Sequence, residues 1–241
     1  MSSVLPAPVA LVTGVGRRIG IANAITETLR SDGWKVVTVG WRAYDDRMPW
    51  RSDPKALADI EADFADAAVP GAVMTRANRE HGPIQALVMC HAESVDSGIR
   101  DTTIESFDRH FAVNARSTWL LIKAYAEQYA SPFGSGRVIA ITSDSTEFNL
   151  PYGASKAALD RIVLDVPDEL SDLGLTANVI NPGATDTGWM SDQIKSSVLE
   201  RNLSPRIGIP QDCANLVRFL LSPEGGWMNK QLLYSDGGVR R

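Results

Sequence analysis

The sequence has only two cysteines, Cys90 and Cys213, among its 241 residues, and it has no long apolar run. Two cysteines are too few for a disulfide framework and lack the spacing of metal ligands, so we expect neither disulfides nor a bound metal. No apolar stretch approaches the roughly 18 residues of a membrane-spanning helix. Residues 1–8 do not have the pattern of a signal peptide. Together these absences predict a cytoplasmic protein that keeps its thiols reduced.

The sequence also lacks an excess of basic residues. It contains 24 Lys and Arg against 29 Asp and Glu, which gives a net charge of −5 at pH 7 and an isoelectric point near 5.3. Nucleic acids and anionic membranes attract cationic surfaces, so we expect neither as a partner. The hydrophobic share of 44% is that of an ordinary globular protein. A chain of 241 residues can bury enough surface to fold without a disulfide or a metal.

Short apolar runs alternate with helical patterns along the whole sequence. Turn residues bound most of the runs, as is typical of buried strands. The predicted strands are residues 9–12, 35–39, 86–89, 138–141, 176–180 and 231–234, and the predicted helices are residues 20–30, 67–80, 104–129, 155–173 and 211–221. This alternation predicts an α/β fold, a doubly wound parallel sheet with helices on both faces. No repeat or linker is visible, so we expect residues 1–241 to form a single Rossmann-fold domain.

Two segments do not fit this alternation. Residues 40–54 are rich in Arg, Asp, Pro and Trp without periodicity, and a loop of that length is usually functional or mobile. The stretch that follows leaves room only for a shortened helix, which we place at residues 55–62. Residues 189–204 have an amphipathic pattern and are expected to form a lid, in which Trp189 and Met190 face either an apolar substrate or the core.

A glycine-rich turn, residues 13–20 (TGVGRRIG), connects the first predicted strand to the first helix. Gly14 and Gly16 permit a tight turn and a close approach of the backbone to a phosphate, while Gly20 allows the helix to pack against the strand. The free N–H groups at the helix start would bind a diphosphate. Such a turn also occurs without a ligand, but its position between strand and helix favours dinucleotide binding.

Tyr152 and Lys156 lie four residues apart in the segment YGASK, so a helix places them on one face. An unperturbed tyrosine has a pKa of about 10 and is a poor proton donor and acceptor at neutral pH. A neighbouring ammonium group favours the phenolate, so we expect Lys156 to lower the pKa of Tyr152 toward the working range of a general acid or base. The spacing is also compatible with an ordinary amphipathic helix.

With these motifs the sequence resembles the short-chain dehydrogenase/reductase family, in particular NADP-dependent members similar to 3-oxoacyl-ACP reductase. The family motif TGxxxGIG matches at Thr13, Gly14, Ile19 and Gly20 and departs at Arg18, which replaces the usual middle glycine. Further matches toward the C-terminus extend the resemblance over nearly the whole chain.

The resemblance implies a catalytic tetrad of Asn114, Ser143, Tyr152 and Lys156, which occur in the family's order. In this arrangement Tyr152 exchanges a proton with the substrate oxygen, and Ser143 holds the same oxygen. Lys156 lowers the tyrosine pKa and binds the nicotinamide ribose, while Asn114 helps to position a water for proton relay. By itself, Asn114 would more often be a polar residue satisfied within its helix.

The resemblance also implies a cofactor site assembled from the whole chain. The glycine turn would hold the diphosphate, Asp63 and Phe64 would lie at the adenine, and the segment after the sixth strand would line the nicotinamide. The implied contacts are Gly14, Gly16, Arg17, Arg18, Ile19, Gly20, Arg42, Asp63, Phe64, Cys90, His91, Ala92, Tyr152, Lys156, Ile180, Pro182, Gly183, Thr185 and Thr187.

The choice between NADP(H) and NAD(H) depends on the end of the second predicted strand. NAD-selective Rossmann proteins carry an acid there that binds the ribose 2′-hydroxyl. Here no acid occurs between the end of this strand and Asp45, whereas Arg17 and Arg42 are placed to pair with a 2′-phosphate. We therefore predict NADP(H) rather than NAD(H). Both arginines would also be compatible with a solvated surface, and Asp45 or Asp46 could fold back toward the ribose.

Two departures from the family pattern lie near the expected site. Residues 90–93 (CHAE) replace the family's NNAG, so that His91 is either a new polar contact or a structural histidine, and Glu93 takes the place of a glycine. Ser143 and Tyr152 are only 9 positions apart, fewer than in the family, which shortens the loop forming one wall of the substrate pocket. We expect a more open or differently shaped pocket.

The sequence thus predicts an NADP(H)-dependent oxidoreductase of the carbonyl reductase type, acting on a small-molecule carbonyl or alcohol substrate. The alternative is a dinucleotide-binding or regulatory protein that has lost turnover, which the altered segment 90–93 and the short loop would allow. The resemblance also implies a homo-oligomer, commonly a tetramer, formed through helices 104–129 and 155–173 and the C-terminal segment.

Overall fold

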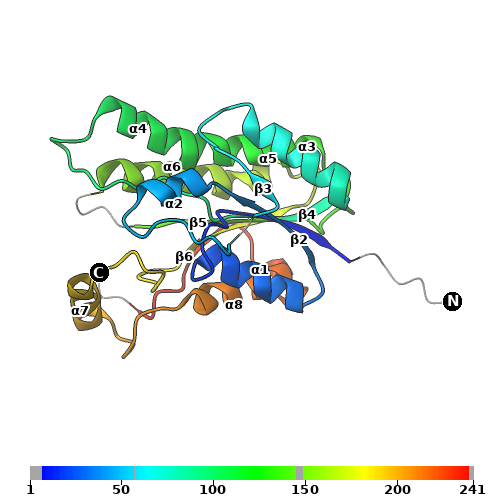
Figure 1. Ribbon diagram of the computed structural model, residues 1–241. Coiled ribbons are helices and arrows are strands. Elements are labelled where there is room, and N and C mark those ends of the chain that lie inside the picture. The colour runs from blue at the N-terminus through cyan, green and yellow to red at the C-terminus, as the bar shows by residue number, and fades with distance from the viewer. Residues whose placement is uncertain (1–6, 57, 145–148, 239–241) are drawn as a thin grey trace.

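A seven-stranded parallel sheet forms the centre of the computed structural model, which describes residues 7–56, 58–144 and 149–238. The strands are β1 (Val9–Thr13), β2 (Lys35–Gly40), β3 (Ile60–Glu61), β4 (Ile84–Met89), β5 (Arg137–Ile141), β6 (Thr176–Asn181) and β7 (Gln231–Tyr234). Their order is β3-β2-β1-β4-β5-β6-β7, so the chain starts inside the sheet and extends it in both directions (Figure 1). This is the doubly wound α/β fold that the alternating pattern predicted.

Helices cover both faces of the sheet (Figure 1). One face is covered by α1 (Ile21–Ser31) and α8 (Pro210–Leu221), and the other by α3 (Val69–His81), α5 (Ser117–Glu127) and α6 (Leu150–Glu169). Successive side chains of a strand point to opposite faces. Ala10 and Val12 of β1 therefore pack under α1 and α8, whereas Leu11 belongs to the cluster under the other three helices. Each face is a buried apolar layer, and the helices predicted at these positions are confirmed.

The long helix predicted for residues 104–129 is divided into three parts. α4 (Ile104–His110) and α5 are α-helices, and η1 (Phe111–Arg116) between them is a π-helix. The prediction of one continuous α-helix is therefore wrong at η1, because an apolar periodicity does not reveal a local change of helix type. Single π-helical turns inside α-helices often occur at functional sites.

The helix α6 begins at Leu150, before the predicted start at residue 155. Pro151 lies in the first turn, where a missing N–H costs no helical hydrogen bond. This earlier start brings Tyr152 into the first turn of α6, with Lys156 one turn later on the same helix.

Residues 40–62 differ most from the prediction. The expected loop contains the helix α2 (Arg42–Arg47), and residues 55–62, predicted as a shortened helix, end instead in the edge strand β3. The Asp59 carboxylate accepts hydrogen bonds from the backbone N and the Oγ1 of Thr38 at 2.8 and 2.7 Å, which ties the segment to β2. These contacts with a neighbouring strand, rather than a periodic pattern, decide the local structure.

The predicted lid contains the helix α7 (Asp192–Arg201), which lies beyond the carboxyl edge of the sheet (Figure 1). Ser191 caps this helix by accepting a hydrogen bond from the Ile194 backbone N at 3.3 Å. None of the residues of α7 is buried. The short 3₁₀ helix η2 (Glu224–Trp227) precedes β7. Among the described residues, no helix has the length and apolar character needed to cross a membrane.

Candidate active site

A cavity of about 1150 Å³ opens at the carboxyl edge of the sheet. Its walls come from the turn after β1, the segments after β2, β4, β5 and β6, the start of α6 and one side of α7. Ligands of doubly wound sheets bind at this edge, where the strand order reverses, here between β1 and β4. The volume lies slightly above the roughly 300–1,000 Å³ of typical small-molecule pockets, so the cavity has room for a dinucleotide.

The glycine turn between β1 and α1 forms one wall of the cavity. Gly14 has a φ of +81°, and a Cβ there would lie 2.6 Å from the His91 backbone N, so only glycine allows this turn to approach the end of β4. A Cβ at Gly16 would lie 2.3 Å from Oδ2 of Asp45. The helix α1 starts at its N-cap Gly20 with neither a side-chain cap nor an acid in its first turn. Its N-terminus therefore fits a diphosphate, which backbone N–H groups and the helix dipole would bind.

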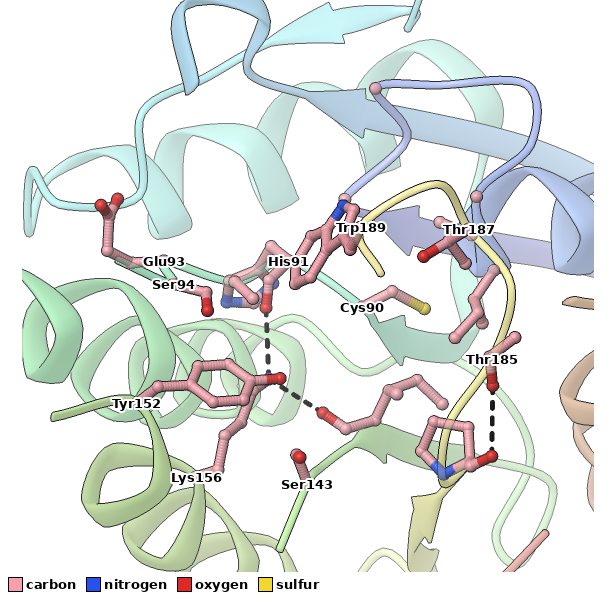
Figure 2. Close-up of a pocket in the computed structure, with 18 of the residues that line it drawn as sticks. Cys90, His91, Glu93, Ser94, Ser143, Tyr152, Lys156, Thr185, Thr187 and Trp189 are labelled. Atoms are coloured by element: carbon pink, nitrogen blue, oxygen red, sulfur yellow. Dashed lines mark hydrogen bonds between the residues drawn. The ribbon is translucent and has the colours of Figure 1, made fainter. Parts of the chain in front are cut away.

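Ser143, Tyr152 and Lys156 converge on the cavity from two elements (Figure 2). Ser143 follows β5, while Tyr152 and Lys156 come from α6. The side chains of Ser143 and Tyr152 are hydrogen-bonded to each other. Lys156 Nζ donates a hydrogen bond to the Ile141 carbonyl oxygen at 2.9 Å and lies 5.8 Å from the centre of the Tyr152 ring. Three of the four residues in the predicted tetrad are thus brought together at the cavity wall.

Asn114, the fourth residue, lies in η1 and does not line the cavity. Its Oδ1 accepts a hydrogen bond from the Glu93 backbone N at 2.8 Å, and its Nδ2 donates to the Glu93 carbonyl oxygen at 2.9 Å. Nδ2 also donates to Oγ of Ser155 at 2.8 Å. The side chain of Asn114 therefore joins the segment after β4 to α6, the helix that carries Tyr152 and Lys156. Its role in positioning a water stays a prediction.

Burial controls the protonation of Tyr152 and Lys156. It raises the pKa of Tyr152 to about 12, and the hydrogen bond with Ser143 opposes this rise. The prediction that Lys156 lowers this pKa is wrong for the present arrangement, because desolvation dominates and Ser143 supplies the opposing interaction. Burial also lowers the pKa of Lys156 to about 8, against the favourable charge interactions with Cys90 and Asp160.

The His91 side chain is held between strand β1 and helix α5. Its Nδ1 lies 2.7 Å from Oγ1 of Thr13 on β1, and its Nε2 lies 2.8 Å from Oγ of Ser117 on α5. The Phe64 ring packs on the imidazole with centroids 4.7 Å apart. Burial lowers the pKa of His91 to about 3, so the ring is neutral and one nitrogen donates while the other accepts. These contacts favour the structural interpretation of this histidine.

Glu93, which stands where the family has a glycine, forms an ion-pair network that the sequence did not reveal. Its carboxylate is almost fully buried and pairs with Arg47 of α2 and with Arg109 of α4, whose Nε lies 3.1 Å away. Arg109 Nη2 also donates to both carboxylate oxygens of Asp63 at 3.2 Å. Trp41 packs against both guanidinium groups. The network joins α2, α4 and the wall expected to face the adenine.

Most residues of the predicted cofactor site line the cavity. They are Gly14, Gly16, Arg17, Gly20, Asp63, Phe64, Cys90, His91, Ala92, Tyr152, Lys156, Pro182, Gly183, Thr185 and Thr187. The structure does not bring Arg18, Ile19, Arg42 and Ile180 into this lining. Each of the four is adjacent in sequence to one residue that does line the cavity, so sequence position alone could not separate them.

Two other arginines of the predicted cofactor site, Arg18 and Arg42, do not line the cavity. Arg18 Nε donates to Oδ2 of Asp53 at 2.7 Å on the exposed side of the turn. The Arg42 backbone N donates to Oε1 of Glu61 at 2.5 Å, at the start of α2. Arg17 alone of the three faces the cavity, and the expectation that Arg42 shares its role is not supported by this arrangement.

Arg17 lies in a group of side chains that sequence reasoning missed. Its guanidinium carbon is 5.1 Å from the Trp50 ring centre and 5.9 Å from that of Trp189. Its Nε lies 3.5 Å from Oδ1 of Asp45. Trp189 therefore stacks on Trp50 at the cavity wall and does not pack in the core. Met190 beside it also lines the cavity.

The segment after β6 forms the wall expected to face the nicotinamide (Figure 2). Thr185 Oγ1 donates a hydrogen bond to the Pro182 carbonyl oxygen at 3.1 Å. Gly183 has a φ of +60°, and a Cβ there would lie 2.4 Å from the Cβ of Asp236, so glycine is required for this turn. Thr187 follows at the cavity wall.

Asp144 and Asn149, in the described part of the short loop between Ser143 and Tyr152, also line the cavity. Residues 145–148 of this loop lie outside the described residues, and the expected openness of the pocket stays a prediction. The end of the loop is held by Asn149, whose Nδ2 donates hydrogen bonds to Oγ of Ser94 at 3.1 Å and to Oδ1 of Asp96 at 2.8 Å.

Comparison with known proteins agrees with this geometry. The family model described as enoyl-(acyl carrier protein) reductase matches residues 14–240. An uncharacterized oxidoreductase of Bacillus subtilis, YjdA, is 31% identical over 97% of both chains. The NADPH-dependent aldehyde reductase 2 of Arabidopsis thaliana is 30% identical over 95% of this chain and 93% of the relative. A short-chain dehydrogenase from Burkholderia cenocepacia, solved in complex with NADP, superimposes with a TM-score of 0.83 at 28% identity, covering 96% of this chain and 97% of the other.

Proposed function

This chain belongs to the short-chain dehydrogenase/reductase family of oxidoreductases, and from this premise we propose that it interconverts a carbonyl compound and a secondary alcohol with NADP(H). The observation that carries the proposal is the meeting of Tyr152, Ser143 and Lys156 at the wall of a cavity that fits a dinucleotide. The four residues of the predicted tetrad come from three separate parts of the sequence, and a protein without turnover would have no need for this arrangement.

The residues of the chain supply binding and proton transfer. The glycine turn and the N-terminus of α1 would bind the diphosphate, and the segment from Pro182 to Thr187 would bind the nicotinamide. When bound, the nicotinamide ring supplies or accepts the hydride. Lys156 would hold the adjacent ribose, and its two backbone carbonyl partners, those of Ile141 and His91, fix the position of its ammonium group.

Tyr152 is the proton donor for carbonyl reduction in this proposal. Burial raises the pKa of Tyr152 to about 12, so the phenol carries its proton at neutral pH, and the hydrogen bond with Ser143 draws this pKa back toward the working range of a general acid. Ser143, hydrogen-bonded to Tyr152, would hold the same substrate oxygen. In alcohol oxidation the proton returns to Tyr152 by the reverse path. Asn114 acts through the backbone of Glu93 and through Ser155 to keep α6 in register with the cavity.

The proposed cofactor is NADP(H). The Arabidopsis relative is named for NADPH dependence and the Burkholderia structure holds NADP, which supports the same cofactor here. Within this chain the support is Arg17, a cavity-facing guanidinium in the glycine turn. A guanidinium suits a 2′-phosphate because it combines charge with directed donors.

The organisation of the protein is part of the proposal. We expect residues 1–241 to act as one domain that associates as a homotetramer. Helices α5 and α6 offer apolar groups for such contacts, among them the half-exposed Trp119, beside a shallow groove that also includes Ile162.

The test is NADPH oxidation, followed at 340 nm, with a panel of small ketones and aldehydes. We expect turnover with at least one member of the panel and NADP(H)-dependent oxidation of the matching alcohol. If NADPH binds tightly while no carbonyl compound is reduced, the alternative of a dinucleotide-binding or regulatory protein replaces this proposal.

A further inference from the structure

Asp45 has an unusual place at the cavity wall. It belongs to α2, five residues beyond the end of β2, and its side chain returns to the glycine turn. Its carboxylate packs so closely on Gly16 that a Cβ there would lie 2.3 Å from Oδ2. Only 6% of Asp45 is exposed. The Asp45 carboxylate is thus largely desolvated and lies against the turn that would bind the phosphates.

Two neighbours hold the carboxylate in this position. Trp50 Nε1 donates a hydrogen bond to Oδ1 at 2.8 Å. Arg17 Nε lies 3.5 Å from the same oxygen, with only 11% of its side chain exposed. Arg17 in turn lies against the rings of Trp50 and Trp189. The cation that would receive a 2′-phosphate is therefore already paired with an acid within the pocket.

This pairing has opposite consequences for the two cofactors. A 2′-phosphate must share Arg17 with the Asp45 carboxylate, and the two anions repel each other at short range in a poorly solvated site. A ribose 2′-hydroxyl carries no charge and can donate a hydrogen bond to a carboxylate. The acid therefore weakens phosphate binding without an equal penalty for a cofactor that lacks the phosphate.

We propose that Asp45 is a specificity-determining residue that limits the preference for NADP(H) over NAD(H) by competing for Arg17. The proposal rests on the proposed function, since it concerns the same cofactor site. It assigns to α2, the helix that the sequence did not predict, the role of bringing an acid to the glycine turn.

The substitution Asp45→Asn isolates the charge. An asparagine has nearly the same shape, can still accept the hydrogen bond from Trp50, and packs in the same way against Gly16. The matched control is Asp46→Asn, which removes the adjacent acid. Asp46 is exposed and accepts a hydrogen bond from Ser52 Oγ on the outer side of α2, so its charge is screened from Arg17 by solvent.

The experiment measures the affinity of wild type and both variants for 2′,5′-ADP and for 5′-AMP by calorimetry at low ionic strength. These probes differ only in the 2′-phosphate. Asp45→Asn should bind 2′,5′-ADP about 10-fold more tightly, the effect of one charged contact, with 5′-AMP changed by less than about 2-fold. Asp46→Asn should match wild type. The NADPH-to-NADH ratio of kcat/KM should rise in parallel in Asp45→Asn.

Two results would overturn the proposal in distinguishable ways. If both probes bind wild type and Asp45→Asn leaves their ratio unchanged, or weakens both equally, then Asp45 has only a structural role. If wild type binds neither probe, the cofactor site itself is refuted and the proposed function fails with it.

Discussion

Trp50 and Trp189 stack with ring centroids 5.1 Å apart and an angle of 11° between their planes. Trp50 follows α2, and Trp189 follows β6 at the start of the lid, so the two rings come from opposite sides of the cavity. Arg17 of the glycine turn lies against both. The two segments that did not fit the alternating pattern of the sequence therefore meet at the cavity wall.

This contact predicts that Trp189→Ala accelerates cofactor exchange. An aromatic pair contributes about 0.5–1.5 kcal/mol beyond its buried area, so the dissociation rate of NADPH should rise by about 2- to 10-fold. Stopped-flow fluorescence of bound NADPH measures this rate. Trp227→Ala is the control, since Trp227 is 97% exposed and does not line the cavity. An unchanged dissociation rate in Trp189→Ala would mean that the stack does not retain the cofactor.

Tyr152→Phe should lower turnover by about 10²–10⁴-fold while leaving the fold and cofactor affinity intact, because only the proton donor is lost. The measurements are kcat, circular dichroism and the Kd of NADPH. Tyr129→Phe, which removes a hydroxyl bonded to the Pro132 carbonyl oxygen far from the site, should retain wild-type turnover. Near wild-type turnover in Tyr152→Phe would exclude the proposed acid.

Arg17→Ala should remove most of the preference for NADPH over NADH, whereas Arg42→Ala should change it little. The reason is that Arg17 faces the cavity and Arg42 does not line it. A charged hydrogen bond is worth about 1.5–3 kcal/mol, so the ratio of kcat/KM values should fall by at least about 10-fold in Arg17→Ala. An equal loss in both variants would restore the two-arginine site expected from the sequence.

Glu93→Gln should destabilise the protein by about 1–3 kcal/mol, which corresponds to a Tm lower by several degrees. The variant leaves Arg47 and Arg109 without the buried carboxylate that both contact. It should also raise the KM for the cofactor, since Arg109 holds Asp63 at the cavity wall. The measurements are Tm and cofactor KM.

Glu80→Gln is the matched control for Glu93→Gln. Glu80 also contacts two arginines, Arg76 and Arg79, but all three side chains are exposed, and solvent screens such pairs. Its Tm and cofactor KM should equal those of wild type. Equal Tm values for the two variants would show that the burial of Glu93 adds nothing to its ion pairs.

His91 should make stability fall in acid. Its folded pKa is about 3, below the ordinary 6.5, so the unfolded chain binds a proton that the folded chain excludes. Stability therefore rises with pH between about 3 and 6.5, and a single group of this kind costs about 2 kcal/mol at pH 5 relative to neutral pH. His91→Asn should lose less stability than wild type between pH 7 and 5, measured by urea unfolding.

The exposed His81 provides the comparison for this pH dependence, because His81→Asn should retain the wild-type loss of stability in acid. If His91→Asn and wild type lose equal stability between pH 7 and 5, His91 does not remain neutral in the fold.

The sequence by itself determined the order of the elements and the position of the cavity. Buried parallel strands require short apolar runs, so six of the seven strands could be predicted from the positions of such runs in the sequence. The glycine turn was visible because a φ of +81° at Gly14 and the lack of space for a side chain at Gly16 demand that residue type. Tyr152 and Lys156 were recognisable because helical spacing places them together.

Only the tertiary structure decided which polar side chains meet. Three contacts join residues that no helical or strand periodicity of the sequence relates. They are the network of Glu93, Arg47 and Arg109, the pairing of Asp45 with Arg17, and the stack of Trp50 on Trp189. The tertiary structure also reversed the expected shift of the Tyr152 pKa, since burial depends on what surrounds the phenol and not on its neighbours in sequence. Local order follows from backbone sterics and periodic burial, but charge pairing and desolvation depend on distances that exist only after the chain has folded.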